Sequence, residues 1–198
     1  MKIGIDISQI AYEGTGVANY VKNLVENLLE YHDTHEYILF YASLRKELPA
    51  SKYWSRGGTL HNNFLSSGKV TIAQYKLPPT VLDILWNRLH IVPIEKFIGN
   101  IDVFISSDWT QPPSKAKKAT ILYDLIVYKY PEETHNQTKF NFKQLILSPN
   151  IVASQKRRLY WVKKEVDAII CISKATKQDA LDILGVSENR LHVVYPGF

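Results

Sequence analysis

Three small residues, Gly14, Thr15 and Gly16, lie between the first apolar segment of the chain and its first helical pattern. Glycine lets the backbone approach a ligand closely, and the N-terminus of the following helix offers unpaired N–H groups to an anion. We therefore expect both glycines at the ligand-binding edge of a sheet, with Gly16 near the first turn of the helix. The same residues also suit a turn that only begins a helix, and the sequence leaves both interpretations open.

The glycine loop does not match the common nucleotide-binding signatures. A dinucleotide-binding loop reads Gly-x-Gly-x-x-Gly and is followed by an acidic residue after the second strand. Here the third glycine position is Asn19, and the second apolar segment ends in Tyr41, Ala42 and Ser43. No Gly-Lys-Ser/Thr follows the loop, as a P-loop requires. A nicotinamide-dependent oxidoreductase is therefore disfavoured.

Polar and aromatic residues also gather at the ends of two later apolar segments. These residues are Asp108 and Trp109 in one place and Tyr123 and Asp124 in the other. Ligands of open α/β sheets bind at the carboxyl ends of the strands, so we expect both pairs on the same edge as the glycine loop. A tryptophan face packs against the C–H groups of a sugar while polar groups take its hydroxyls. The alternative is an exposed loop with a packing tryptophan and aspartates that cap helices.

A basic and aromatic segment lies on a predicted helix near residue 160. Around Tyr160 and Trp161 it carries five basic residues: Lys156, Arg157, Arg158, Lys163 and Lys164. Such a helix is suited to contact with anionic lipid, and we name all five as candidate membrane contacts. Nucleic acid also binds such patches, although we expect no nucleic-acid partner here. The alternative is the solvated face of an ordinary helix.

Composition limits the class of protein. The chain has 198 residues, 45% of them hydrophobic, and a net charge of +5. That length supports one domain with a full core, and the positive charge suits an anionic partner. We predict no metal site and no cofactor, because only His32 and His35 are closely spaced, at an expected helix end. A single cysteine, Cys171, excludes a disulfide framework. An acid at Asp6 and the lack of a long apolar run predict a cytoplasmic protein, with the basic helix at the inner face of the membrane.

The order of apolar segments predicts alternating strands and helices. The expected strands are residues 2–7, 36–42, 69–74, 101–106, 118–123, 167–172 and 190–194. The expected helices are residues 16–29, 78–90, 93–98, 137–165 with an interruption near Pro149, and 174–184 between Ser173 and Gly185. Residues 43–68 have no clear period and predict an irregular excursion. This pattern predicts a single α/β domain over residues 1–198, a Rossmann-like open, mostly parallel sheet with helices on both faces.

Several segments together resemble the N-terminal domain of retaining glycosyltransferases of family 4, which have the GT-B fold. The segments follow the chain in order: Ile3 to Asp6 with Gly14 to Tyr20, Asp108 to Pro113, Thr120 to Leu125, Tyr130 to Glu132, Ile172 to Asp179 with Ser173 and Thr176 at a helix start, and Gly185 to Gly197. The combination spans nearly the whole chain.

The resemblance implies an enzyme that transfers a hexosyl group from a nucleotide-sugar to a glycan or lipid-linked acceptor of the cell envelope, with retention. The N-terminal domain would hold the acceptor at Asp108, Trp109, Tyr123 and Asp124, and its glycine loop would approach the donor phosphates. A C-terminal domain with paired glutamates, which this chain lacks, would hold the nucleotide, so the isolated chain would be inactive. We therefore expect the chain to be the front half of a longer polypeptide.

One position departs from the family. The residue before Asp124 is commonly histidine, and this chain has Tyr123. Tyrosine still donates a hydrogen bond but titrates poorly near neutral pH. A non-catalytic ligand-binding or interaction module on the same fold is the alternative function.

Overall fold

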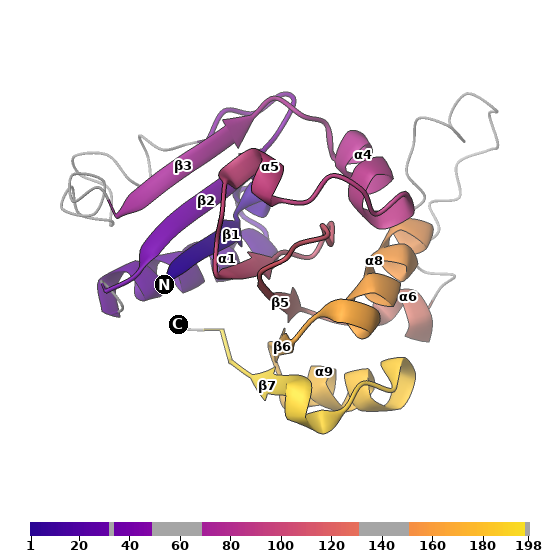
Figure 1. Ribbon diagram of the computed structural model, residues 1–198. Helices are drawn as coiled ribbons and strands as arrows, with labels where there is room; N and C mark the ends of the chain where they lie inside the picture. The colour runs from indigo at the N-terminus through magenta and orange to yellow at the C-terminus, as the bar shows by residue number, and fades with distance from the viewer. Residues whose placement is uncertain (32–33, 49–68, 131–150, 197–198) are drawn as a thin grey trace, which may run out of the picture.

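The computed structural model describes residues 1–31, 34–48, 69–130 and 151–196 (Figure 1). Within them, seven strands form one sheet in the order β3-β2-β1-β4-β5-β6-β7, and every neighbouring pair is parallel. The strands are β1 Lys2–Asp6, β2 Glu36–Ala42, β3 Val70–Tyr75, β4 Val103–Ser106, β5 Lys117–Leu122, β6 Ala168–Cys171 and β7 Leu191–Val193. Each predicted strand is confirmed to within two residues.

The helices connect these strands and cover the sheet. The longer ones are α1 Gly16–Tyr31 and α8 Ile151–Glu165. The shorter ones are η1 Ser8–Ala11, α4 Pro79–Leu82 continued by the π-helical η2 Asp83–Arg88, α5 Glu95–Ile98, α6 Ile126–Lys129, α9 Lys174–Asp179 continued by η3 Ala180–Leu184, and η4 Glu188–Arg190. None of the helices in the described ranges is long and apolar enough to cross a bilayer.

Local signals set several of these boundaries. Ser173 Oγ accepts a hydrogen bond from the N–H of Thr176 at 3.0 Å, which caps α9. Gly185 ends η3 with a φ of 60°, the left-handed conformation that glycine adopts without strain. The expected helix before Pro149, His32 and most of the excursion at 43–68 lie outside the described residues.

The two faces of the sheet bury different hydrophobic clusters, because successive strand residues point to opposite faces. On one face, Ile5 and Leu39 share a cluster with Val21 and Val25 of α1. On the opposite face, Phe40 shares a cluster with side chains of the α4–α5 segment, and β5 and β6 pack against α8 and α9. Helices therefore cover both faces of the sheet, as the sequence predicts (Figure 1).

Candidate functional site

The carboxyl ends of β1 and β4 meet where the chain reverses the direction in which it adds strands. β2 and β3 lie on one side of β1, whereas β5, β6 and β7 lie beyond β4. Loops that leave two such strands diverge, and the crevice between them is where open α/β sheets bind ligands. The residues after β1 and β4 therefore define the candidate site.

Asp6, the last residue of β1, ties three strand ends together. Its carboxylate accepts hydrogen bonds from the N–H and Oγ of Ser8, at 2.9 and 2.6 Å, and from Ser107 Oγ at 2.7 Å. Ser8 Oγ accepts in turn from the N–H of Ala42 at 3.0 Å. Burial raises the pKa of Asp6, and the bonds from Ser8 and Ser107 oppose that rise. Asp6 was missing from the predicted site, although an acidic residue at the end of a buried strand is a signal for it.

The glycine loop lies at this edge, between η1 and α1, where we expected it. Gly14 has a φ of 82°, so its backbone conformation favours glycine. Gly16 has no positive φ, and a Cβ built on it would meet no other part of the protein within 4 Å. The turn therefore requires the first glycine, while neither backbone conformation nor packing requires the second.

Thr15 begins α1. Its Oγ1 donates to the carbonyl of Tyr12 at 2.9 Å and accepts from the N–H of Ala18 at 3.2 Å. The N–H groups at 16 and 17 belong to the first turn and have no acceptor within the helix. Unpaired N–H groups at a helix N-terminus are suited to bind an anion.

Trp109 follows β4 and faces the glycine-loop side of the crevice. Its ring stacks on Tyr12, with centroids 5.0 Å apart and planes at 24°. The Trp109 carbonyl accepts from Asn87 Nδ2 at 3.0 Å, which fixes the loop. Beside Trp109 lies a cavity of about 270 Å³, whose walls include Asp108 and Gln155. An aromatic face next to a carboxylate and an amide is suited to binding a sugar.

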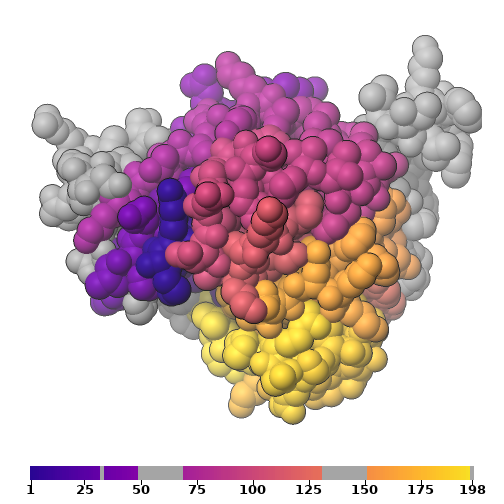
Figure 2. All heavy atoms as spheres, in the orientation of Figure 1, coloured from indigo at the N-terminus to yellow at the C-terminus, as the bar shows by residue number. Residues whose placement is uncertain are grey.

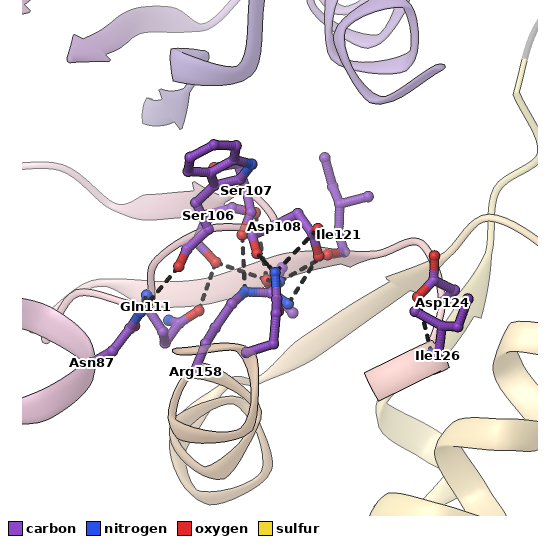
Figure 3. Close-up of polar contacts among 12 residues, drawn as sticks. Asn87, Ser106, Ser107, Asp108, Gln111, Ile121, Asp124, Ile126 and Arg158 are labelled. Atoms are coloured by element: carbon purple, nitrogen blue, oxygen red, sulfur yellow. Dashed lines mark hydrogen bonds and ion pairs between the residues drawn. The ribbon is translucent and has the colours of Figure 1, made fainter. Parts of the chain in front are cut away.

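Asp108 is held by α8 (Figure 3). Arg158 Nη1 donates to Asp108 Oδ1 at 3.2 Å, and Gln155 Nε2 donates to the Asp108 carbonyl at 2.7 Å. Burial raises the pKa of Asp108 to about 6; Arg158 opposes the rise and Asp124 adds to it. Asp108 is thus a carboxylate that titrates close to neutral pH inside the cavity.

Arg158 corrects one prediction. We expected it among the membrane contacts, yet it is fully buried. Its guanidinium donates to Thr120 Oγ1 at 2.8 Å and to the carbonyls of Ile121 and Ser107 at 2.9 and 3.1 Å, besides Asp108. Consecutive residues of a helix point about 100° apart, so three basic residues in a row cannot all lie on the exposed face of α8. One of them points toward the sheet. The other four basic residues of the run remain at least partly exposed.

Tyr123 lies beneath the crevice and is only 8% exposed. Its ring packs edge-to-face on Tyr20, with centroids 5.5 Å apart. The hydroxyl has no hydrogen-bond partner among the described residues. Burial, with Asp108 nearby, raises the pKa of Tyr123, so the phenol stays protonated. A buried donor without a partner is unfavourable unless a ligand or water completes it.

The remaining predicted site residues have local structural contacts. Asp124 Oδ1 accepts from the N–H of Ile126, the first residue of α6, at 3.1 Å (Figure 3). Thr176 Oγ1 donates to the Tyr123 carbonyl at 2.9 Å, and Ser173 caps α9. Among the described residues, no group of three His, Cys, Asp or Glu side chains is arranged to hold a metal ion.

A doubly wound parallel sheet with a glycine loop at its switch point is the architecture of one half of a GT-B glycosyltransferase. A family model for Glycosyltransferase Family 4 matches residues 14–198, and the chain therefore belongs to this family. Its fold is similar to the structure of the wall teichoic acid polymerase TagF, H444N variant, with a TM-score of 0.50 and 10% sequence identity. The match covers 99% of this chain but only 38% of the TagF chain. No curated protein sequence matches the chain.

Proposed function

We propose that this domain is the acceptor side of a glycosyltransferase that moves a sugar from a nucleotide-sugar to a glycan or lipid-linked acceptor, with retention of configuration. The observation that carries the proposal is Gly16. It begins the helix that follows β1 at the switch point, and neither its φ nor its packing requires glycine. A position without a side chain there permits close approach of a ligand to the backbone.

On the donor side, the first-turn N–H groups of α1 bind a phosphate oxygen of the nucleotide-sugar. The positive end of the helix stabilises that charge as the sugar leaves the phosphate, and the proposal needs no cofactor. A second Rossmann-like domain in the same enzyme holds the nucleotide across the cleft.

On the acceptor side, the exposed Trp109 ring packs against a sugar ring in the cavity of about 270 Å³. The Asp108 carboxylate accepts a hydrogen bond from an acceptor hydroxyl, and Arg158 holds it in place. Tyr123 supplies a neutral donor, since its hydroxyl lacks a partner among the described residues. A protonated phenol does this without the titration that a histidine would show near neutral pH.

Gly16→Val in the full-length enzyme tests the proposal. The valine side chain would occupy the phosphate position, so we expect transfer to fall at least tenfold, about 1.4 kcal/mol of lost stabilisation, with an unchanged melting temperature. Asn27→Val, at an exposed position of α1, is the control for a β-branched residue in this helix. Normal transfer by a stable Gly16→Val enzyme would remove the loop from the donor site. Absence of transfer from every nucleotide-sugar tried by the unmutated enzyme would favour the non-catalytic module.

A further inference from the structure

The acceptor cavity of about 270 Å³ has walls from three parts of the chain. The α4–η2 segment forms one side and α8 another, and the surfaces of these segments adjoin in Figure 2, in magenta and orange. The loop after β4 contributes Trp109, which is 40% exposed. How this ring is held therefore decides what the cavity offers to a sugar.

The backbone of Trp109 is fixed from η2, whereas its ring is not. Asn87 Nδ2 donates to the carbonyl of Trp109 at 3.0 Å, and Asn87 Oδ1 accepts from the N–H of Gln111 at 3.0 Å. Asn87 is buried, so these two bonds hold the loop after β4 against η2. The indole N–H of Trp109 makes no hydrogen bond to another described residue, so packing must set the direction of the ring.

Tyr12 supplies that packing on one face of the Trp109 ring. The two rings are stacked, with centroids 5.0 Å apart and planes at 24°. Trp109 lines both the acceptor cavity and a smaller cavity of about 30 Å³, whereas Tyr12 lines only the smaller one. Tyr12 therefore acts on an acceptor through the Trp109 ring rather than by contact.

Tyr12 is itself held in place by its neighbours. Its N–H donates to the carbonyl of Gln9 at 2.9 Å and its carbonyl accepts from Thr15 Oγ1 at 2.9 Å, so η1 and the glycine loop fix its backbone. Lys46 Nζ lies 5.4 Å from the centre of the Tyr12 ring and donates to the carbonyl of Ala11 at 2.7 Å. An aromatic ring attracts a cation at that distance, so Lys46 limits the movement of the Tyr12 side chain.

We propose that Tyr12 is a positioning residue for the acceptor. It fixes the Trp109 ring with the face opposite the stack open to a sugar, so that the acceptor does not have to order the ring when it binds. An exposed side chain loses rotational freedom on binding, and a ring that is fixed beforehand avoids that loss. A stacked aromatic pair also contributes more than the area it buries. Because the acceptor role of Trp109 belongs to the proposed function, this role of Tyr12 rests on that function as well.

Steady-state kinetics of the full-length enzyme test this role. Tyr12→Ala should raise the KM for the acceptor about fivefold, with kcat and the KM for the donor changed less than about twofold, because the Trp109 ring becomes free to rotate. Tyr12→Phe keeps the stack and should hold the KM within about twofold of the unmutated value. Tyr31→Ala removes an exposed tyrosine from the other end of α1 and should leave the KM unchanged. An equal rise in the KM for the donor would overturn the role, since Tyr12 would then act through the glycine loop.

A double variant separates positioning from direct contact. Without the indole, Tyr12 has no ring to hold, so Tyr12→Ala with Trp109→Ala should raise the KM about tenfold, the same as Trp109→Ala alone. A rise of about fiftyfold, the product of the two single effects, would overturn the positioning role, because Tyr12 would then contact the acceptor itself.

The order of the Trp109 ring can be measured without any substrate. The indole ¹⁵N–¹H signal of Trp109, identified by its loss in Trp109→Phe, should show a lower heteronuclear NOE in Tyr12→Ala than in the unmutated enzyme and in Tyr12→Phe. Equal values in all three proteins would overturn the role of Tyr12 even if the KM rises. Absence of transfer by the unmutated enzyme would overturn the proposed function and this role together, whereas an unmutated enzyme that transfers sugar, with an unchanged KM in Tyr12→Ala, would overturn this role alone.

Discussion

Replacement of Arg158 by methionine would remove a fully buried guanidinium from the junction of β4, β5 and α8. Methionine keeps the length of the apolar stem but donates no hydrogen bond. The substitution leaves the carbonyls of Ser107 and Ile121, the hydroxyl of Thr120 and the carboxylate of Asp108 without this donor. It therefore tests whether Arg158 holds the floor of the candidate site, as its contacts indicate.

The expected loss follows from those contacts. Removal of one partner of a buried ion pair lowers the free energy of unfolding by about 3–5 kcal/mol. The side chain of Asp108 is 24% exposed, so water can solvate part of its charge, and the lower half of that range applies. For a domain of this size, each kcal/mol lowers the melting temperature by roughly 2–4 °C, so we expect a fall of about 6–16 °C at pH 7.5.

The stability loss caused by Arg158→Met should depend on pH, and the sign of that dependence follows from the pKa of Asp108. Burial already raises the pKa of Asp108 to about 6, and Arg158 opposes that rise, so its removal raises this pKa further. A carboxyl group with a raised folded pKa stabilises the fold below its unfolded pKa and loses that contribution as pH rises through the folded value. The difference between Arg158→Met and the unmutated protein should therefore be smaller at pH 5 than at pH 7.5.

Urea unfolding at both pH values measures the effect. Lys163→Met is the matched control, since this cation on the same helix is exposed and its change should stay within about 0.5 kcal/mol. A loss below about 1 kcal/mol for Arg158→Met, or one equal to that of the control, would refute the reasoning.

Three further predictions concern the crevice. The pKa of Asp108 is raised from 3.8 to about 6, so its ionisation should lower the free energy of unfolding of the unmutated protein by up to about 3 kcal/mol between pH 4 and pH 7. Asp108→Asn should lose less over the same range, and parallel curves of stability against pH for the two proteins would contradict this. Gly14→Ala should lower the free energy of unfolding by about 1–2 kcal/mol, because Gly14 has a φ of 82°. Gly16→Ala should not lower it. Equal melting curves for the two variants would show that the turn tolerates a side chain at residue 14. Trp109→Ala should raise the KM of the full-length enzyme for the acceptor about tenfold with little change in kcat, because stacking of the acceptor sugar on the ring is lost. An unchanged KM would place the acceptor elsewhere.

Much of the fold could be predicted because its signals are local. The strand at Glu36–Ala42 is a run of apolar residues between polar ones, and its observed bounds match the predicted ones. The cap at Ser173 and the stop at Gly185 depend on chain neighbours within one helical turn. The helix predicted from Pro78 to His90 is less regular than expected, since its second part, Asp83–Arg88, is π-helical.

The location of the candidate site was predictable, but the direction of its side chains was not. Parallel strands bring their carboxyl ends to one edge, which is why the glycine loop, Asp108 and Tyr123 could be expected together. Whether a side chain points into the crevice depends on what packs behind it. Asp124 bonds to the N–H of Ile126 beside it in the chain, and Arg158 turns inward because β4 and β5 present polar partners to it.

The sequence by itself determined the order of strands and helices, the glycine turn and the caps, because each depends on residues that are close along the chain. Only the tertiary structure decided which polar groups meet. Ser107 reaches Asp6 and Glu165 reaches His90 across separations of 101 and 75 residues, and Arg158 reaches Asp108 across 50. Such contacts exist only after the crossovers have placed β1 beside β4 and packed α8 over β5, and the low-polarity interior formed there strengthens each hydrogen bond made within it.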